Sequence, residues 1–440
     1  MQPANQSFGF LKFKGKQLDS GYLSKTPIVQ FLLVSALFPM WGAAQSLNDI
    51  LITQFKAIFH LSYLASAYVQ SSFFLGYFLT AILASYLIKK TSYKFTIIVG
   101  LTLYLTGCIL FFPASQSATY AYFLLALFVL ATGLSFLETS ADTFSSLLGP
   151  ENNRVLRLNI AQTFNPIGAV AGILLGKYLI FGNGPDLADQ LKHASAVKQV
   201  ALAEAALHRT LLPYRYMIIV LILLLIGFCV IQFPKCKPIT TEKADPLWKT
   251  VMDLLKNHKF TFGMFTQFMY MGLQVGVWSF TIQLALHLNK SISDSQASNF
   301  VIMSYIAFFI GRLSADKLMQ KIKPLKVFMA YSILALLGII FIVLEHGFIS
   351  VYAAILVSGF MGPCYATIYS TSIGFVTNPH QRETAGALMV MMIIGGGIWP
   401  LVQGFAADVT GSMSLSFGVQ IITLAVMILF AVFNLKTVQK

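Results

Sequence analysis

The feature that most constrains this chain is a succession of long apolar runs separated by short polar loops. Six runs fall within residues 27–233 and six more within 260–435, and a charged linker at 234–259 separates the two sets. A helix needs about 20 apolar residues to cross the hydrocarbon core of a bilayer. The pattern predicts an all-α membrane protein with twelve transmembrane helices in two six-helix bundles, flanked by tails at 1–26 and 436–440.

Composition agrees with a membrane location. Apolar residues make up 57% of the chain and charged residues 10%, whereas soluble domains carry about 25% charged residues. The net charge of +14 comes from lysines and arginines in short loops, so we attribute it to membrane topology rather than to nucleic-acid binding. The four cysteines are scattered without disulfide or metal-ligand spacing, and the polar N-terminus does not look like a cleavable signal peptide.

Lysine and arginine also predict orientation. The N-terminal tail, the linker and alternate loops carry most of the 30 basic residues. Cytoplasmic loops are enriched in such residues, so we expect both termini and the linker to be cytoplasmic, in a multi-pass protein of the bacterial inner (plasma) membrane. Lys56 and Lys177 lie near the expected outer helix ends, where long side chains can snorkel to the interface.

Prolines and glycines mark expected breaks and joints. We expect Pro39 to kink the first run, because proline removes a helical hydrogen bond, and Pro113 to close the third. A polar stretch at 182–213 is expected to precede a sixth run at 214–233. The glycines at 395–397 permit close helix approach and bending, and we interpret them as moving parts rather than ligands.

Glu138 is the polar residue that bears most on function, because it lies inside the apolar run at 120–148. A carboxylate there costs roughly 2.5–3.5 kcal/mol on insertion scales. Glu138 must therefore be protonated, paired or facing water between helices. Asp142 lies four residues along the same helix face, and repulsion between two carboxylates favours a proton on at least one. The alternative for Asp142 is a solvated position near the cytoplasmic end, or a pair with Arg154 or Arg157.

Asp49, in the first run, is the second intramembrane carboxylate. Such groups mark proton and substrate pathways, and the alternative is a hydrogen bond between helices. The part of the second half that matches Glu138 carries hydroxyl groups such as Thr367 in place of an acid. This asymmetry suggests that one half handles the proton and both halves hold the substrate.

Amides and aromatic rings in other runs are candidate substrate contacts. One face of the fifth run carries two amides, which donate and accept hydrogen bonds as sugar hydroxyls require. The seventh run has a polar and aromatic stripe, and the tenth has two tyrosines four residues apart. The alternatives are interhelical hydrogen bonds and ordinary helix packing. The candidate substrate-binding residues are Gln162, Asn165, Gln267, Gln274, Trp278, Tyr365 and Tyr369.

Several short motifs are distributed along the chain. They are Ser-Leu-Asn-Asp-Ile-Leu-Ile-Thr-Gln-Phe at 46–55, Leu-Glu-Thr at 137–139, Leu-Gly-Pro-Glu at 148–151, Arg-Leu-Asn at 157–159, Ala-Gln-Thr-Phe-Asn at 161–165, Trp-Ser at 278–279, Phe-Ile-Gly-Arg at 309–312 and Ile-Ile-Gly-Gly-Gly-Ile at 393–398. Taken together, these motifs resemble those of a known family, the L-fucose–proton symporters of the major facilitator superfamily. The resemblance covers nearly all of the chain between Gln30 and Phe430.

The resemblance implies two six-helix bundles with alternating access, and import of a monosaccharide together with a proton. It assigns proton coupling to Asp49 and Glu138 and places Gln162 and Asn165 near the sugar. The chain departs from the family pattern at Gln45 and Ser46, where the family has two asparagines, and at 140–143, where Ser-Ala-Asp-Thr replaces the usual Ala-Ala-Asn-Pro. The sugar therefore stays open among L-fucose, glucose, galactose and N-acetylglucosamine.

The expected partners are a monosaccharide, a proton and the lipid bilayer, and we expect a monomer. Sodium coupling, efflux of amphipathic cations and sugar sensing without transport are the alternative functions. No nucleophile–base set, P-loop or metal cluster is apparent in the sequence, so we expect neither an enzyme nor a cofactor or metal site.

Overall fold

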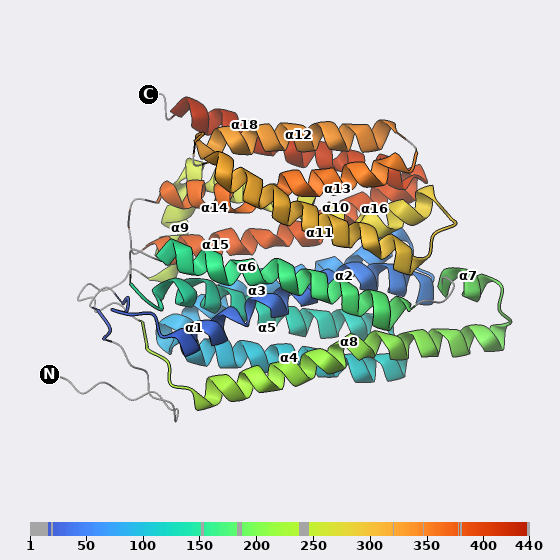
Figure 1. Ribbon diagram of the computed structural model, residues 1–440, viewed down its shortest axis with the longest axis horizontal. Coiled ribbons are helices and arrows are strands. Elements are labelled where there is room, and N and C mark those ends of the chain that lie inside the picture. Colours follow the sequence, from blue (N-terminus) through green and yellow to red (C-terminus); the bar gives the residue numbers. More distant parts are fainter. Residues whose placement is uncertain are drawn as a thin grey trace.

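Long helices that run side by side form almost the whole molecule (Figure 1). The computed structural model describes residues 16–18, 21–150, 154–182, 187–236, 246–319, 321–345, 347–376, 378 and 381–437. The first bundle contains α1 (Ile28–Ser35), α2 (Phe38–Ile58), α3 (Tyr63–Lys90), α4 (Tyr93–Ser117), α5 (Tyr120–Leu147), α6 (Arg154–Leu175) with its π-helical end η2 (Gly176–Phe181), α7 (Leu187–Lys192) and α8 (Ala196–Val230).

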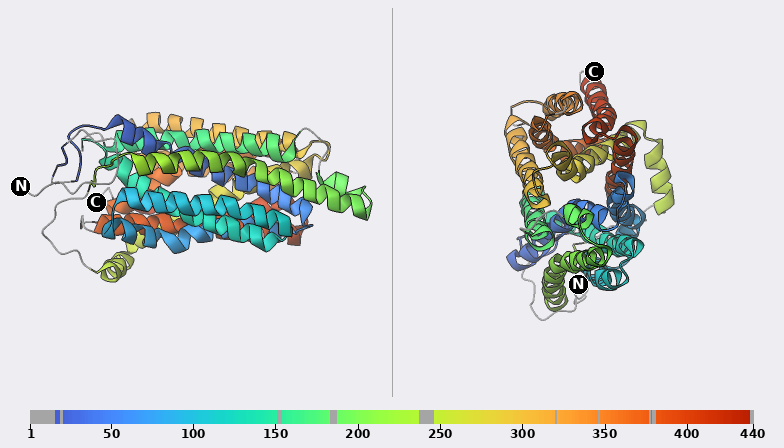
Figure 2. Two further views of the ribbon diagram at one scale, coloured as in Figure 1. Left: turned by 90° about the horizontal axis from the view of Figure 1, so that it is seen from below. Right: turned by 90° about the vertical axis from the view of Figure 1, so that its right-hand side faces the viewer.

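The second bundle follows a short helix, α9 (Leu247–Lys256), in the predicted linker. Its elements are α10 (His258–Leu288), α11 (Asp294–Met319), α12 (Pro324–Leu344), α13 (Ile349–Met361), α14 (Cys364–Gly374), α15 (Arg382–Met391), η4 (Met392–Ile394), α16 (Gly395–Thr410), α17 (Met413–Ser416), η5 (Phe417–Val419) and α18 (Gln420–Thr437). Seen along the helices, the two bundles lie one beside the other (Figure 2, right). The predicted all-α, two-bundle membrane fold is confirmed.

Eleven spans among the described residues are long and apolar enough to cross a membrane. The twelfth spanning helix is α10, which has 31 residues but carries the amides Gln267, Gln274 and Gln283. These side chains are all buried inside the protein. Helix α10 is therefore shielded from lipid, and its low apolarity reflects a position at the centre of the molecule.

The expected kink in the first span is present. Helix α1 ends at Ser35, and α2 begins at Phe38 with Pro39 in its first turn. Proline is tolerated at the start of a helix, where its missing N–H would have no partner anyway. The break divides the span into a short segment and a longer one, and the longer one carries Asp49.

The prediction that Pro113 closes the third run was wrong. Helix α4 runs through Pro113 to Ser117, and α8 runs through Pro213 from Ala196 to Val230. The polar stretch predicted at 182–213 is therefore largely helical. At about 1.5 Å per residue, the 35 residues of α8 extend well beyond a hydrocarbon core about 30 Å thick. In a bundle, contacts with neighbouring helices compensate for the single hydrogen bond that each proline removes.

Close packing of α4 on α5 fixes the helix that bears Glu138. A side chain on Gly133 of α5 would collide with the backbone of Tyr104 on α4. A side chain on Gly100 would come within 2.9 Å of both the Gly133 carbonyl oxygen and the Leu137 side chain. Small residues let helices approach closely in membranes, so glycines on both helices allow α4 to pack tightly against the Glu138 segment of α5.

The two ends of the molecule differ. Helix α1 begins and α18 ends at the same end, on the left in Figure 1. We call the opposite end, where α2 ends and α7 lies, the distal end. The bundles meet where α3 packs on α15 and α16, α2 on α10, and α6 with η2 on α11. These contacts bring the predicted site residues of the two bundles together.

Candidate functional site

Asp49 lies at the junction of the two bundles. It is 2% exposed, and its Oδ1 accepts hydrogen bonds from Gln70 Nε2 and from Ser279 Oγ, both at 3.0 Å. Its Oδ2 accepts one from the Tyr305 hydroxyl at 3.2 Å. Gln70 Nε2 also donates to Ser279 Oγ at 2.9 Å. Three donors on α3, α10 and α11 thus converge on one carboxylate of α2.

The Asp49 network continues into the second bundle through aromatic rings. The Tyr305 ring lies 4.3 Å from that of Trp278, measured between centroids. Trp278 Nε1 donates to Ser358 Oγ at 3.3 Å, and its ring meets Phe308 edge-on. Trp278 is only 4% exposed. The structure therefore places this predicted sugar-stacking residue in the wall behind Asp49, with its indole N–H already bonded to protein.

Glu138 belongs to a separate cluster on α5. Its side chain is half-buried, and the hydroxyl of the buried Tyr77 on α3 is its hydrogen-bond partner. Asp142, one turn away, interacts electrostatically with Glu138. Both carboxyl groups are within electrostatic range of Tyr365 on α14. The two acids of α5 thus face the opposite bundle, as a site between the bundles requires.

Asp142 is bonded to an amide. Gln162 Nε2 donates to Asp142 Oδ1 at 2.9 Å. Arg157 donates instead to backbone carbonyls at the end of α5 and beyond it: to Pro150 at 2.8 Å, to Ser145 at 3.4 Å and to Ser146. Of the two arginines considered for Asp142, Arg157 is therefore engaged elsewhere, and the side chain of Arg154 lies outside the described residues.

Gln162 and Asn165 are both half-buried on α6. The predicted shared face is present, and Gln162 is held by Asp142. Asn165 lies at a close contact between α6 and α2, since a side chain on Gly42 would collide with the Asn165 carbonyl oxygen. The two amides therefore lie between the acid pair of α5 and the helix that carries Asp49.

Tyr365 and Tyr369 are brought together as a stacked pair on α14. Their ring centroids are 6.1 Å apart and the ring planes differ by 12°. Both rings are half-buried, and Tyr369 also interacts electrostatically with Asp142. This pair presents aromatic faces opposite the acids and amides of the first bundle.

The amides of α10 occupy different surroundings. Gln267 is fully buried, and neither atom of its amide has a hydrogen-bond partner among the described residues. Gln274 is 8% exposed. A buried amide without partners costs free energy, and the role of Gln267 in substrate binding stays a prediction.

Contacts across the bundles close the distal end. Both carboxylate oxygens of Asp408 on α16 accept backbone N–H groups at the start of α3, from Tyr63 and Leu64, each at 2.9 Å. Lys177 Nζ donates to Asn299 Oδ1 at 2.5 Å, joining η2 to α11. Lys177 is thus engaged between the bundles, whereas the sequence suggested snorkelling. The hydrogen bonds between the bundles at Asp408, Lys177 and Asp49 all lie in the distal half.

The glycines at 395–397 form part of this closure. Ser71 Oγ on α3 donates to the Gly397 carbonyl at 2.5 Å. A side chain on Gly396 would come within 2.9 Å of the Phe74 ring. The predicted role as moving parts stays a prediction, but the structure shows that these glycines allow α16 to touch α3.

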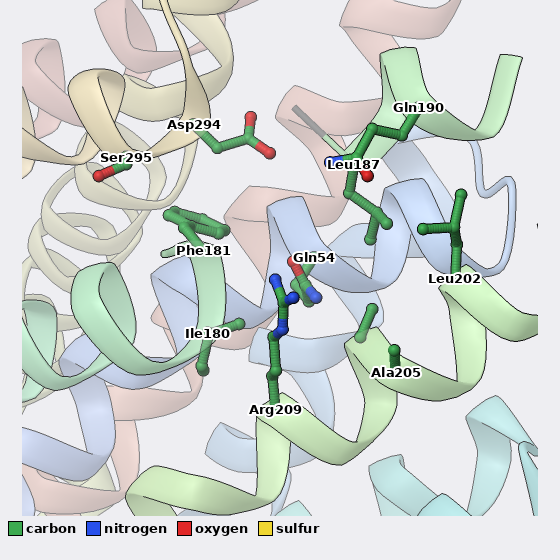
Figure 3. A pocket seen from close by; sticks show the side chains of 11 residues that line it. Gln54, Ile180, Phe181, Leu187, Gln190, Leu202, Ala205, Arg209, Asp294 and Ser295 are labelled. Carbon is green, nitrogen blue, oxygen red and sulfur yellow. The ribbon is translucent and has the colours of Figure 1, made fainter. Parts of the chain in front are cut away.

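Two cavities lie at the distal end. The larger, about 620 Å³, is lined by both bundles and includes Thr53, Lys56 and Gln283. The buried Gln283 amide has no partner there among the described residues. The smaller, about 50 Å³, lies among Gln54, Arg209 and Asp294 (Figure 3). Ligand sites are typically about 300–1,000 Å³, so only the larger could admit a sugar, and it lies outside the Asp49 network.

Sequence reasoning missed the groups that hold the acids. Gln70, Ser279 and Tyr305 bind Asp49, and Tyr77 binds Glu138. A usable signal was present for Gln70, the only amide in the second apolar run. For the hydroxyl groups the sequence gives no such signal, because serine and tyrosine are frequent in membrane helices.

A membrane protein of two helical bundles with buried carboxylates between them has the architecture of a secondary transporter. Residues 30–396 match the sequence profile of the Major Facilitator Superfamily. The chain is 34% identical to the L-fucose-proton symporter of Escherichia coli (strain K12) over 439 residues, covering 98% of this chain and 99% of that one. It therefore belongs to the major facilitator superfamily and, within it, to the family of the L-fucose–proton symporters.

Other similarities agree with this assignment. The chain is 30% identical to a putative glucose/galactose transporter of Helicobacter pylori (strain ATCC 700392 / 26695) over 416 residues, covering 92% and 96% of the two chains. The crystal structure of FucP in the outward conformation matches with a TM-score of 0.71 at 33% identity, covering 92% of this chain and 98% of that one. An inward-facing bacterial Spinster homologue matches with a TM-score of 0.70 at 14% identity, covering 93% and 96%, which shows the shared fold.

Proposed function

We propose that this protein imports a monosaccharide, L-fucose or a similar hexose, by proton symport with alternating access. The observation that carries the proposal is the pair of intramembrane acids, Asp49 and Glu138, each held at the boundary between the bundles. The names of the relatives support a sugar as substrate and a proton as coupling ion.

The orientation is part of the proposal. The basic residues of the tails, linker and alternate loops favour a cytoplasmic position for both termini. The distal end then faces outward from the bacterial inner membrane. The boundaries inferred from the sequence, with bundles at 27–233 and 260–435 and a linker at 234–259, belong to the same proposal, as does a monomeric state.

Proton coupling is assigned to Glu138, with Asp49 as the second site. Protonation neutralises an acid, and this lowers the cost of closing the protein around it. Glu138 is half-buried and lies beside a second acid, so it can exchange a proton while the cavity is open. Asp49 is enclosed by its hydrogen-bond donors, so its protonation state changes when the bundles separate.

Sugar binding is assigned to residues of both bundles. Gln162 and Asn165 supply amides from α6, and the stacked tyrosines 365 and 369 supply ring faces from α14. Gln267 and Gln274 add amides from α10. Trp278 contributes indirectly: its N–H is bonded to Ser358, so its ring forms part of the wall behind Asp49. A sugar held by both bundles would draw them together, and alternating access requires such closure.

The proton gradient is sufficient for accumulation. One charge that crosses the membrane yields roughly 2.3 kcal/mol per 100 mV. At about 1.4 kcal/mol per tenfold change in concentration, a potential of roughly 150 mV supports accumulation by a few hundredfold.

A panel of labelled sugars in proteoliposomes tests the proposal. L-Fucose, D-galactose, D-glucose and N-acetylglucosamine are supplied outside, with an inwardly directed pH gradient. We expect one of them to accumulate without sodium, and an uncoupler to abolish this accumulation. Uptake that requires sodium and survives the uncoupler would show that sodium, and not the proton, is the coupling ion. Failure of every sugar to accumulate would refute the proposal.

A further inference from the structure

Helix α9 differs from the spanning helices in direction. It lies beside the second bundle at the end opposite the distal end and runs across the long axis of the molecule (Figure 1). In the view along the spanning helices, α9 is seen lengthwise on the outside of the bundle (Figure 2, right). Its axis is therefore close to parallel with the plane of the membrane.

The helix is fixed in this direction by its junction with α10. Asn257 separates the two helices, and its side chain accepts the Phe260 N–H at 3.2 Å, which caps α10. The Asn257 amide nitrogen also donates to the Phe375 carbonyl at 3.1 Å. Thr250, Val251 and Leu254 form the buried face of α9, which packs on α10 and α15.

A second face of α9 is apolar and exposed. Trp248, Met252 and Leu255 are 73%, 42% and 40% exposed. They recur at intervals of four and three residues, so they form one stripe, turned about 120° from the buried face at 100° per residue. The other tryptophans, Trp41, Trp278 and Trp399, are 4%, 4% and 8% exposed. Trp248 is thus the one tryptophan that meets the surroundings of the protein.

A third face is basic. Lys249 and Lys256 are exposed beyond the apolar stripe, and the exposed Lys259 follows at the start of α10. Asp253 is the acid on this face, at 3.7 Å from Lys256. A helix with one face on protein, one apolar face and one basic face can satisfy all three only at the boundary between acyl chains and charged headgroups.

We propose that α9 is an interfacial anchor that binds anionic lipid headgroups. Trp248, Met252 and Leu255 insert among the upper acyl chains, where tryptophan is favoured. The lysines bind the lipid phosphates, which attract basic residues near the surface. The anchor holds the N-terminal end of α10, the helix that carries the buried amides and Ser279. The proposal is independent of the sugar or coupling ion.

Fluorescence of Trp248 tests the position of the helix. The full-length protein is placed in phosphatidylcholine–phosphatidylglycerol vesicles whose lipids carry bromine near the top of the acyl chains. We expect strong quenching, most of which disappears in Trp248→Phe. The phenylalanine variant preserves the apolar stripe and should transport sugar as the native protein does. Quenching of Trp248 by aqueous iodide, without quenching by brominated lipid, would overturn the proposal.

Headgroup selectivity is tested by brominating one lipid at a time in the same mixture. Native protein should be quenched several-fold more by brominated phosphatidylglycerol than by brominated phosphatidylcholine. Combined Lys249→Gln, Lys256→Gln and Lys259→Gln should reduce that ratio to about one. The matched control neutralises Lys321 and Lys323, in the loop before α12, and Lys326, in the first turn of α12; all three are exposed, and this variant should keep the native ratio. Equal quenching in native protein would refute binding of anionic lipid.

Discussion

Asp49 and Glu138 are both acids placed inside the membrane, yet their surroundings differ. Asp49 is closed in by three donors, two of which belong to the opposite bundle. Glu138 is half-buried, and its hydrogen-bond partner Tyr77 belongs to its own bundle. The bundles can therefore separate without breaking the bond at Glu138, whereas separation at the distal end must break the bonds at Asp49.

This difference suggests a division of labour. Glu138 can exchange its proton whenever the cavity around it is open, and so it suits a proton carrier. The hydrogen bonds of Asp49 depend on closure of the distal end, because only the closed arrangement supplies all of the donors to its carboxylate. Buried carboxylates without hydrogen bonds are costly, so the charge of Asp49 and the closure of the outer end should depend on each other.

Removal of the Glu138 charge should have the largest effect. We expect Glu138→Gln to abolish proton-driven accumulation and to preserve sugar exchange, since glutamine keeps the shape and hydrogen-bonding capacity but cannot carry a proton. Labelled sugar uptake and counterflow in the same vesicles measure both. Asp142→Asn is the matched control: asparagine keeps the acceptor for Gln162, and we expect it to retain accumulation. Full accumulation by Glu138→Gln would break the comparison.

Removal of Asp49 should instead open the distal end. Hydrogen bonds to charged groups contribute about 1.5–3 kcal/mol each. Asp49→Ala should therefore shift the equilibrium between the closed and the open distal end toward the open form by at least about tenfold. Val275→Cys gives the reporter, because Val275 is 2% exposed and lies by Gly396 and Phe74 at the bundle boundary. We expect a membrane-impermeant maleimide added outside to label it faster in Asp49→Ala and at the original rate in Glu138→Gln.

Equal labelling in all three backgrounds would mean that Asp49 does not hold the distal end. Faster labelling in both acid variants would mean that the two acids share one role. Either result would remove the distinction between the two clusters.

Loss of the Asp408 cap should have a smaller effect of the same kind. Asp408 accepts two N–H groups at the start of α3, and removal of a helix cap costs about 0.5–2 kcal/mol. At about 1.4 kcal/mol per tenfold, Asp408→Ala should favour outward opening by roughly 2- to 30-fold. The same Val275→Cys labelling measures it. Asp408→Asn keeps one acceptor, so its labelling rate should fall between those of the native protein and Asp408→Ala. Slower labelling in Asp408→Ala than in the native protein would contradict the role of Asp408 in closing the distal end.

The sequence predicted the helices well, because a bilayer leaves the backbone few alternatives to a helix. The error at Pro113 has a physical cause. Local reasoning treats proline as a helix end, whereas α4 and α8 are supported by neighbouring helices that the sequence does not display. The small effect of one lost hydrogen bond in a packed bundle could not be read from the residue alone.

The site was predicted in part. Asp49 and Glu138 were identifiable because acids in apolar runs are rare and costly. Their partners were not, because Ser279 and Tyr305 lie 230 and 256 residues from Asp49 along the chain. Such pairing depends on how the bundles dock. For the same reason Trp278 appeared to be a free aromatic face, although its indole N–H is bonded to Ser358.

The smallest expected effect concerns Cys236, one of the three buried native cysteines. Burial raises the pKa of the Cys236 thiol to about 12, so at pH 7 only about one thiol in 10⁵ is ionised, and the thiolate is the reactive form. We expect under a tenth of Cys236 to be modified by maleimide in an hour, as measured by peptide mass spectrometry. Stoichiometric modification would show that Cys236 is accessible.

The central claim is that Glu138 changes charge each time a sugar passes it. Sugar-induced proton influx, followed with a pH-sensitive dye in proteoliposomes without an imposed gradient, tests it most directly. The account predicts proton influx with each sugar in the native protein and none in Glu138→Gln, while sugar exchange continues in both. Proton influx of native size in Glu138→Gln would contradict it.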